Sequence, residues 1–149
     1  MYKFYIVTYL LIFLKLNLVS DSSISSSKEE IEIVLLKNYN ALNKKDTSTV
    51  VKLYHPQTNL PISKKGLDKY LSKYDVKYKI EKIRFIGSDL NNFIVIYNEE
   101  TEFRKKGDLE LLEKVSTEVI MVFRKYKGKF KIYTSQTLKP GSFNKKEFQ

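Results

Sequence analysis

Few side chains in this sequence are of the types that most often perform catalysis. The 149 residues include no cysteine and a single histidine, His55. Thiolate nucleophiles, disulfides and thiolate-held metals are therefore excluded, and a metal site would need several carboxylates to converge on one imidazole. No spacing in the sequence indicates such a cluster, so we expect neither a metal nor a cofactor. His55 stands directly before Pro56, a place where a histidine most often closes a helix and bonds a nearby carbonyl group.

Glu100 and Tyr39 are the two residues that could serve a reaction. A carboxylate in a pocket with apolar walls has a raised pKa and can act as a general base. The phenol of Tyr39 could donate a hydrogen bond to a developing oxyanion. The simpler interpretation, which we favour, is that Glu100 lies at the solvated end of a sheet and that Tyr39 is a core aromatic residue. No acid–base pair is recognisable, so the question of catalysis stays open and the sequence leans towards a non-catalytic protein.

Helices are expected to position these groups from the N-terminal side. Ser27 and Glu30 form a capping box, and apolar residues follow at helical spacing to about Asn43. Asp46 can cap a short second helix, which Pro56 ends. Ser63 can cap a third helix that runs to about residue 74.

Strands are expected to position them from the C-terminal side. After Asp75 the apolar residues recur at every second position, which predicts strands over 76–85, 92–105, 109–125 and 129–138. A change of parity near Glu81 and Lys82 predicts a β-bulge. Lys106–Gly107 and Lys127–Gly128 are typical of two-residue hairpin turns. The expected fold class is α+β, with helices packed on an antiparallel sheet.

Strand register decides which side chains share a face. If both turns contain two residues, Ile94 pairs with Val119, Ile96 with Thr117 and Met121 with Thr134. The face that carries Ile94, Ile96 and Met121 would then be the core side. Its polar members and one residue of the first helix are the candidate ligand-binding residues: Tyr39, Asn98, Glu100, Thr117, Thr134 and Gln136.

The opposite face of the sheet is too apolar for a solvated surface and too charged for a core. Such a face fits a partner surface. Its residues predict a homodimer interface: Val95, Tyr97, Ile120, Val122 and Tyr133. Glu99 and Lys114 would lie on the same face as a cross-strand ion pair.

Two segments resemble the nuclear transport factor 2-like superfamily, which includes the SnoaL-like proteins and the ketosteroid isomerases. The segment from Asp46 to Pro56 is similar to the family's short second helix with its aromatic-His-Pro turn. The hairpin from Val122 to Ile132 is similar to its two closing strands. The resemblance implies a bent sheet wrapped on helices around a cone-shaped pocket, a cystatin-like roll. It also implies dimerisation through the outer sheet face, but no particular activity, because members include both enzymes and binding proteins.

The N-terminal segment is expected to lie outside this domain. A positive charge at Lys3, an apolar run over residues 4–14 and a serine-rich exit are typical of a secretory signal peptide. We therefore predict a signal peptide over residues 1–22, a serine-rich linker over 23–27, the domain over 28–139 and a polar tail over 140–149. The expected location is secreted or periplasmic, and the alternative is a membrane anchor formed by residues 4–19.

Net charge leaves three classes of function open. The chain carries 27 basic and 17 acidic residues, but the basic clusters fall at hairpins on opposite ends of a meander, which does not favour a nucleic-acid track. The favoured hypothesis is an exported, non-catalytic domain that binds a small apolar or amphipathic ligand, or a protein partner. The alternatives are a small isomerase or cyclase, and a basic module for anions or nucleic acid. Contact with a membrane is expected only through the signal segment.

Overall fold

A computed structural model describes residues 24–88, 91–107 and 113–139. The predicted signal peptide and polar tail lie outside these residues. The chain divides into two compact units, Met1–Ile33 and Val34–Gln149, and the second contains both short helices and the whole sheet. Within the described residues, no helix has the length and apolar character needed to cross a membrane.

The first helix covers residues 24–43, so it begins before the expected cap. Ser27 lies inside the helix rather than at its N-cap, and residues 24–27 are helical rather than a linker. Serine in a helix interior costs only a fraction of a kcal/mol relative to alanine, up to about 0.7, so a capping box does not by itself stop a helix from extending. Leu35 and Tyr39 of this helix are buried.

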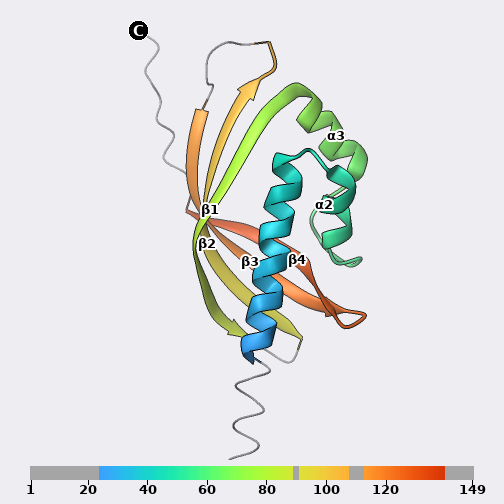
Figure 1. Cartoon of the computed structure of the whole chain (residues 1–149), viewed down its shortest axis with the longest axis vertical. Coiled ribbons are helices and arrows are strands. Elements are labelled where there is room, and N and C mark those ends of the chain that lie inside the picture. Colours follow the sequence, from blue (N-terminus) through green and yellow to red (C-terminus); the bar gives the residue numbers. More distant parts are fainter. Residues whose placement is uncertain (1–23, 89–90, 108–112, 140–149) are drawn as a thin grey trace, which may run out of the picture. The chain divides into compact units, whose positions relative to one another are not determined.

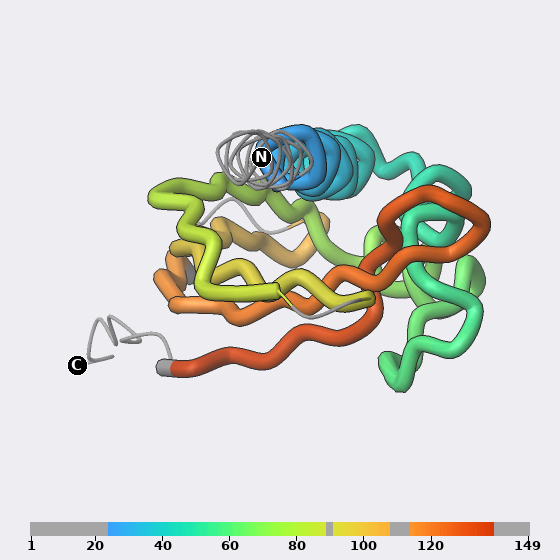
Figure 2. Tube along the Cα trace, turned by 90° about the horizontal axis from the view of Figure 1, so that it is seen from below, coloured from blue at the N-terminus to red at the C-terminus, as the bar shows by residue number. Residues whose placement is uncertain are grey.

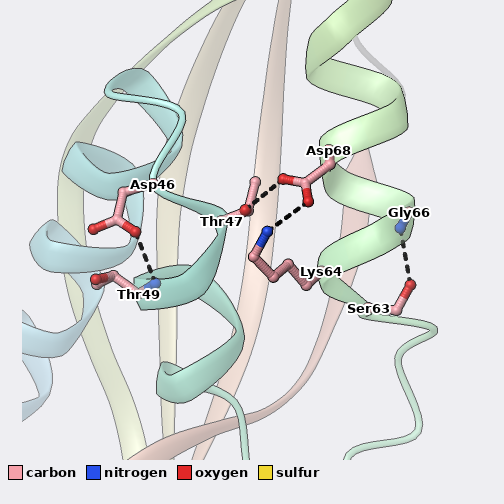
Figure 3. Close-up of polar contacts among 7 residues, drawn as sticks. All are labelled: Asp46, Thr47, Thr49, Ser63, Lys64, Gly66 and Asp68. Carbon is pink, nitrogen blue, oxygen red and sulfur yellow. Dashed lines mark hydrogen bonds and ion pairs between the residues drawn. The ribbon is translucent and has the colours of Figure 1, made fainter.

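Two short helices follow, and both begin at the predicted caps. Helix α2 spans Thr47–Leu53, and the Asp46 side chain accepts a hydrogen bond from the Thr49 backbone. Helix α3 spans Lys64–Lys73, and the Ser63 hydroxyl accepts one from Gly66. Figure 3 shows how the two helices are tied together, because Asp68 of α3 accepts a hydrogen bond from Thr47 of α2. Lys64, one turn earlier in α3, also donates to Asp68.

Four antiparallel strands form one sheet in the order β1-β2-β3-β4. They span Tyr74–Ser88 (β1), Asn92–Lys105 (β2), Glu113–Tyr126 (β3) and Lys129–Lys139 (β4). The register of β1 shifts between Glu81 and Arg84, and Lys82 has a positive φ of 54°, so the predicted bulge is confirmed. Figure 1 shows the strong curvature of these strands, and the α+β fold class is confirmed.

The β3–β4 hairpin has the predicted two-residue turn, but the β2–β3 connection does not. Tyr126 pairs with Lys129 across Lys127 and Gly128, whose φ angles are both positive as the primed turn requires. By contrast, β2 ends at Lys105 and β3 begins at Glu113, so the connection covers residues 106–112. The pairing therefore moves by three positions, and Ile94 lies opposite Val122 instead of Val119.

Because the shift is by an odd number of positions, the two faces of β2 are exchanged relative to the prediction. We call inner the face that carries the buried residues Val95, Tyr97, Val119, Met121 and Phe123. The outer face carries Ile94, Ile96, Ile120 and Val122, which are half-buried. A second register shift, between Val122 and Phe123, places Thr134 opposite Val122 and Gln136 opposite Ile120, both on the outer face.

An additional stretch of chain lies along the free edge of β4. Tyr54 forms a parallel bridge with Ile132, the His55 backbone donates to the Ile132 carbonyl at 2.8 Å, and the Thr58 hydroxyl donates to the Tyr133 carbonyl at 2.7 Å. We call residues 54–58 the edge segment. Figure 2 shows the β3–β4 hairpin, in orange and red, beside the chain that leads out of α2.

Candidate functional site

Two neighbouring glutamates of β2 lie on opposite faces of the sheet. Glu100 is on the outer face, where its carboxylate pairs with Lys114 at 2.9 Å. Glu99 is on the inner face, opposite Thr117. The carboxylate on the helix side is therefore Glu99, and the predictions of Glu100 as the pocket carboxylate and of a Glu99–Lys114 ion pair are wrong.

Hydroxyl groups, not basic groups, surround the Glu99 carboxylate. Tyr39 donates its phenol proton to Glu99 Oε2, and Thr101 donates its hydroxyl proton to Oε1 at 3.0 Å. The Tyr39 and Tyr97 oxygens are 2.7 Å apart. Because the one proton of Tyr39 goes to Glu99, Tyr97 must be the donor to Tyr39. The result is a directed chain of hydrogen bonds from Tyr97 through Tyr39 to Glu99.

Burial keeps the phenols of this chain protonated. It is the largest cause that raises the pKa of Tyr39 and of Tyr97 well above the ordinary value, and the nearby negative charge of Glu99 adds to it. The pKa of Tyr78 is raised in the same way. At neutral pH these phenols are therefore uncharged and take part in hydrogen bonds near one carboxylate, that of Glu99.

Asn38 adds an acceptor on the same side of the sheet. Its side chain is 2% exposed and hydrogen-bonds to Tyr54, which lowers the pKa of that phenol against the larger, raising effect of burial. The Asn38 Oδ1 atom, however, has no hydrogen-bond partner among the described residues. A buried carbonyl oxygen without a donor is uncommon in native proteins.

The predicted ligand-binding residues are divided between the two faces. Tyr39 and Thr117 lie on the inner side, as expected. Asn98, Glu100, Thr134 and Gln136 lie on the outer face. The long β2–β3 connection displaces the first two, and the register shift at Val122 and Phe123 displaces the last two.

The predicted interface residues are divided as well. Val95 and Tyr97 are 0% exposed in the core, so they cannot form an outer contact surface. Ile120 and Val122 do lie on the outer face and are half-buried. Tyr133 lies at the β4 edge, with the Arg124 guanidinium 3.5 Å from its ring centre.

His55 lies on the edge segment and contacts the β3–β4 hairpin. Its ring packs edge-on against Tyr126 and Tyr133, with ring centres 5.4 and 5.5 Å apart. Its Nδ1 accepts a hydrogen bond from the Gln57 backbone at 3.0 Å, which requires the neutral tautomer with the proton on Nε2. Burial lowers the pKa of His55, and the charge of Arg124 lowers it further.

A cleft of about 390 Å³ opens beside this histidine. The Lys131 ammonium donates to the Lys52 carbonyl at its rim. No set of three potential metal ligands comes together among the described residues. The cleft is lined by Val51, Lys52, Tyr54, His55, Pro56, Thr58, Ile62, Tyr126 and Lys131.

Sequence reasoning missed Glu99 because both parities of β2 begin with apolar residues. Phe93, Val95 and Tyr97 alternate with Ile94 and Ile96, so neither set is marked as the core. The second half of the strand carries the distinguishing signal. The even positions 98, 100 and 102 are all polar, whereas the odd set ends in Phe103, and this difference favours the odd set as the inner one.

Comparison with known proteins places this geometry in context. Residues 33–140 match the family described as the C-terminal domain of anti-sigma-I factor RsgI9. Among curated proteins, none is similar to the chain in sequence.

Solved structures share the fold at low sequence identity. A candidate scytalone dehydratase from Novosphingobium aromaticivorans superimposes with a TM-score of 0.68 at 12% identity, over 79% of this chain and 86% of the other. LinA gives 0.66 at 8% identity, over 79% and 88% of the two chains. A candidate dehydratase of the nuclear transport factor 2-like family from Streptomyces avermitilis gives 0.58 at 13% identity, over 76% and 96%. These likenesses confirm the expected fold of helices packed on a curved antiparallel sheet. The identities are too low to transfer an activity.

Proposed function

Because the chain belongs to the family of the C-terminal domain of anti-sigma-I factor RsgI9, we propose that it is an exported, non-catalytic domain that binds a small ligand at Glu99. The observation that carries this proposal is the environment of the carboxylate. Glu99 accepts hydroxyl protons from Tyr39 and Thr101, and no described lysine or arginine forms an ion pair with it. A polar group held in place among aromatic side chains is typical of a small-molecule site.

The hydrogen-bond directions favour binding over catalysis. Tyr39 gives its proton to Glu99 and Tyr97 gives its proton to Tyr39, so Tyr39 has no proton left for an oxyanion. The single histidine lies at the β4 edge and hydrogen-bonds to Gln57. The described residues therefore offer no acid–base pair next to Glu99, as proton transfer to and from a substrate would require. The family name, which is that of an anti-sigma factor, agrees with a regulatory role.

Access to the Glu99 side chain supports the same proposal. Glu99, Thr101, Thr117 and Tyr78 are all half-buried rather than buried, so each keeps some contact with solvent. Below them the core is closed by Val95 and Tyr97, which are 0% exposed. A ligand would thus contact a closed core and a polar group that is accessible.

Export is proposed from the N-terminal sequence. Lys3, the apolar run over residues 4–14 and the serine-rich stretch that follows are the features of a signal peptide. Intact-mass measurement of the protein recovered from the medium or the periplasm of an expressing bacterium tests this. We expect loss of about the first 22 residues, and a cytoplasmic protein that keeps Met1 would refute export.

The binding proposal is tested with a pair of matched variants. Glu99→Gln and Glu100→Gln make the same chemical change at neighbouring positions on opposite faces. A library of small molecules is screened by NMR on protein with labelled tyrosine rings. We expect ligands that shift the signals of Tyr39 and Tyr97, and that are lost in Glu99→Gln but kept in Glu100→Gln. A library in which every hit survives Glu99→Gln would refute the proposed site.

A further inference from the structure

The charge of Glu99 acts on five tyrosines from five different elements. Tyr39 comes from the first helix, Tyr54 from the edge segment, Tyr70 from α3, Tyr78 from β1 and Tyr97 from β2. The Tyr39 ring lies in the middle, edge-on to Tyr78 at 5.7 Å and to Tyr97 at 5.8 Å. Tyr70 and Tyr78 are joined by a side-chain hydrogen bond. We call this set the tyrosine cage.

The cage holds one negative charge that no described base neutralises. For all five phenols burial raises the pKa most, and in each case the charge of Glu99 contributes as well. The phenols therefore stay neutral at physiological pH, and Glu99 remains the charge that they share. By contrast, Glu100 and Glu102 on the outer face both pair with Lys114, at 2.9 and 3.7 Å.

The carboxylate and its neighbours also offer unused hydrogen-bond acceptors. The protons of Tyr97, Tyr39 and Thr101 are all used within the cluster. The carboxylate oxygens of Glu99 can each accept a further hydrogen bond, and Asn38 Oδ1 accepts none from the described residues. A ligand that supplies donors and positive charge would satisfy these groups, whereas an anion would be repelled by the charge of Glu99.

Aromatic rings near a carboxylate favour organic cations. An ammonium group is attracted to the electron-rich face of a tyrosine ring, and the interaction strengthens when water is excluded. We infer that the inner-face site binds a small organic ammonium ion, with the N–H groups directed at Glu99 and the carbon body against the tyrosine cage. This inference rests on the proposed function, because it names the ligand class of the same site.

Three probes of one shape test the inference. Benzylammonium, benzyl alcohol and benzoate carry a cationic, a neutral and an anionic head on the same aromatic body. The full chain has a net charge of +10, so non-specific attraction favours benzoate, and a preference for the cation must come from the site. Dissociation constants are measured at neutral pH from the tyrosine-ring NMR signals of the 149-residue protein.

We expect benzylammonium to bind about tenfold or more tightly than benzyl alcohol, and benzoate to be the weakest. Glu99→Gln should abolish this preference and Glu100→Gln should keep it. Tyr78→Phe, which retains the ring, should bind within about twofold of the wild type, and Tyr78→Ala should lose about tenfold. Near-ultraviolet circular dichroism of each variant shows that the fold is kept.

Other outcomes overturn the inference and separate it from the proposed function. If benzyl alcohol binds as tightly as benzylammonium and shifts the cage tyrosines, the site exists and the ligand class is wrong. If none of the three probes shifts the cage tyrosines, the cation inference falls, and the library screen with Glu99→Gln decides the proposed function independently. A cation preference that survives Glu99→Gln would place the recognition elsewhere and would also refute the inference.

Discussion

The directed hydrogen-bond chain from Tyr97 through Tyr39 to Glu99 predicts unequal effects from two similar substitutions. Tyr39→Phe removes the proton that Glu99 accepts and the oxygen to which Tyr97 donates. Tyr97 is 0% exposed, so its hydroxyl would be left buried without a partner. Tyr97→Phe removes the first donor of the chain, and Tyr39 still donates to Glu99.

The magnitudes follow from these two losses. A hydrogen bond to a charged group contributes about 1.5–3 kcal/mol, and a buried donor without a partner costs about 1–3 kcal/mol. We expect Tyr39→Phe to lower the free energy of unfolding by about 2–4 kcal/mol. Tyr97→Phe breaks a bond between two neutral hydroxyls and leaves no buried donor, so its expected cost is about 0.5–1.5 kcal/mol.

The double variant gives the sharper test. Tyr39→Phe combined with Tyr97→Phe removes the stranded hydroxyl, so its cost should be lower than the sum of the two single costs by about 1 kcal/mol or more. Urea denaturation followed by circular dichroism measures all three values. Equal costs for the two single variants, or simple additivity in the double variant, would refute the hydrogen-bond directions assigned here.

Three further expectations concern pH and association. In Glu99→Gln, ultraviolet titration should show tyrosines ionising at lower pH, because the charge that helps to raise their pKa is gone. In the wild type, the free energy of unfolding should fall above about pH 10, where the tyrosines of the unfolded chain ionise and those of the folded chain do not. His55 has a lowered pKa, so the free energy of unfolding should not depend on His55 above about pH 6.5 and should fall by at most about 1.4 kcal/mol per pH unit below it. His55→Phe keeps a ring between Tyr126 and Tyr133 and should flatten that slope in urea denaturation measured at several pH values. An unchanged slope would contradict the assignment. We also propose that the outer face forms a homodimer, so that Ile120→Glu with Val122→Lys should give a monomer in light scattering; a wild-type chain that is already monomeric at high concentration would exclude it.

Local signals in the sequence were sufficient for most elements of the fold. Asp46 and Ser63 are polar residues placed directly before helical patterns, and both act as caps in the structure. The parity change near Lys82 and the Lys127–Gly128 turn depend on the backbone of a few neighbouring residues. Such features are encoded within a short stretch of chain, which is why they can be predicted from it.

The identity of the site residues depended on a non-local quantity, the register of β2 against β3. Lys106–Gly107 has the residue types of a tight turn. The last pair between β2 and β3 is nevertheless Phe103 with Glu113, so the connection is longer than two residues. The offset of three positions places Glu99, instead of Glu100, on the inner face of the sheet. It also places Tyr97 in the core. Tyr39 escaped this error because helical periodicity, which does not depend on strand pairing, places it on the inner side.

The edge segment also determines how the sheet meets other chains. A free sheet edge is a template on which a second polypeptide can pair, and residues 54–58 occupy the edge of β4 at Ile132 and Tyr133. The residues beyond this covered part, Thr134 to Thr137, have hydroxyl or amide side chains, so they add no large apolar side chain to that edge. Proteolytic cleavage at the exposed Pro56 or Gln57 would uncover the apolar part of the edge next to Phe130 and Ile132. The expected product of such a cut is therefore a strand-paired aggregate rather than a loosened monomer.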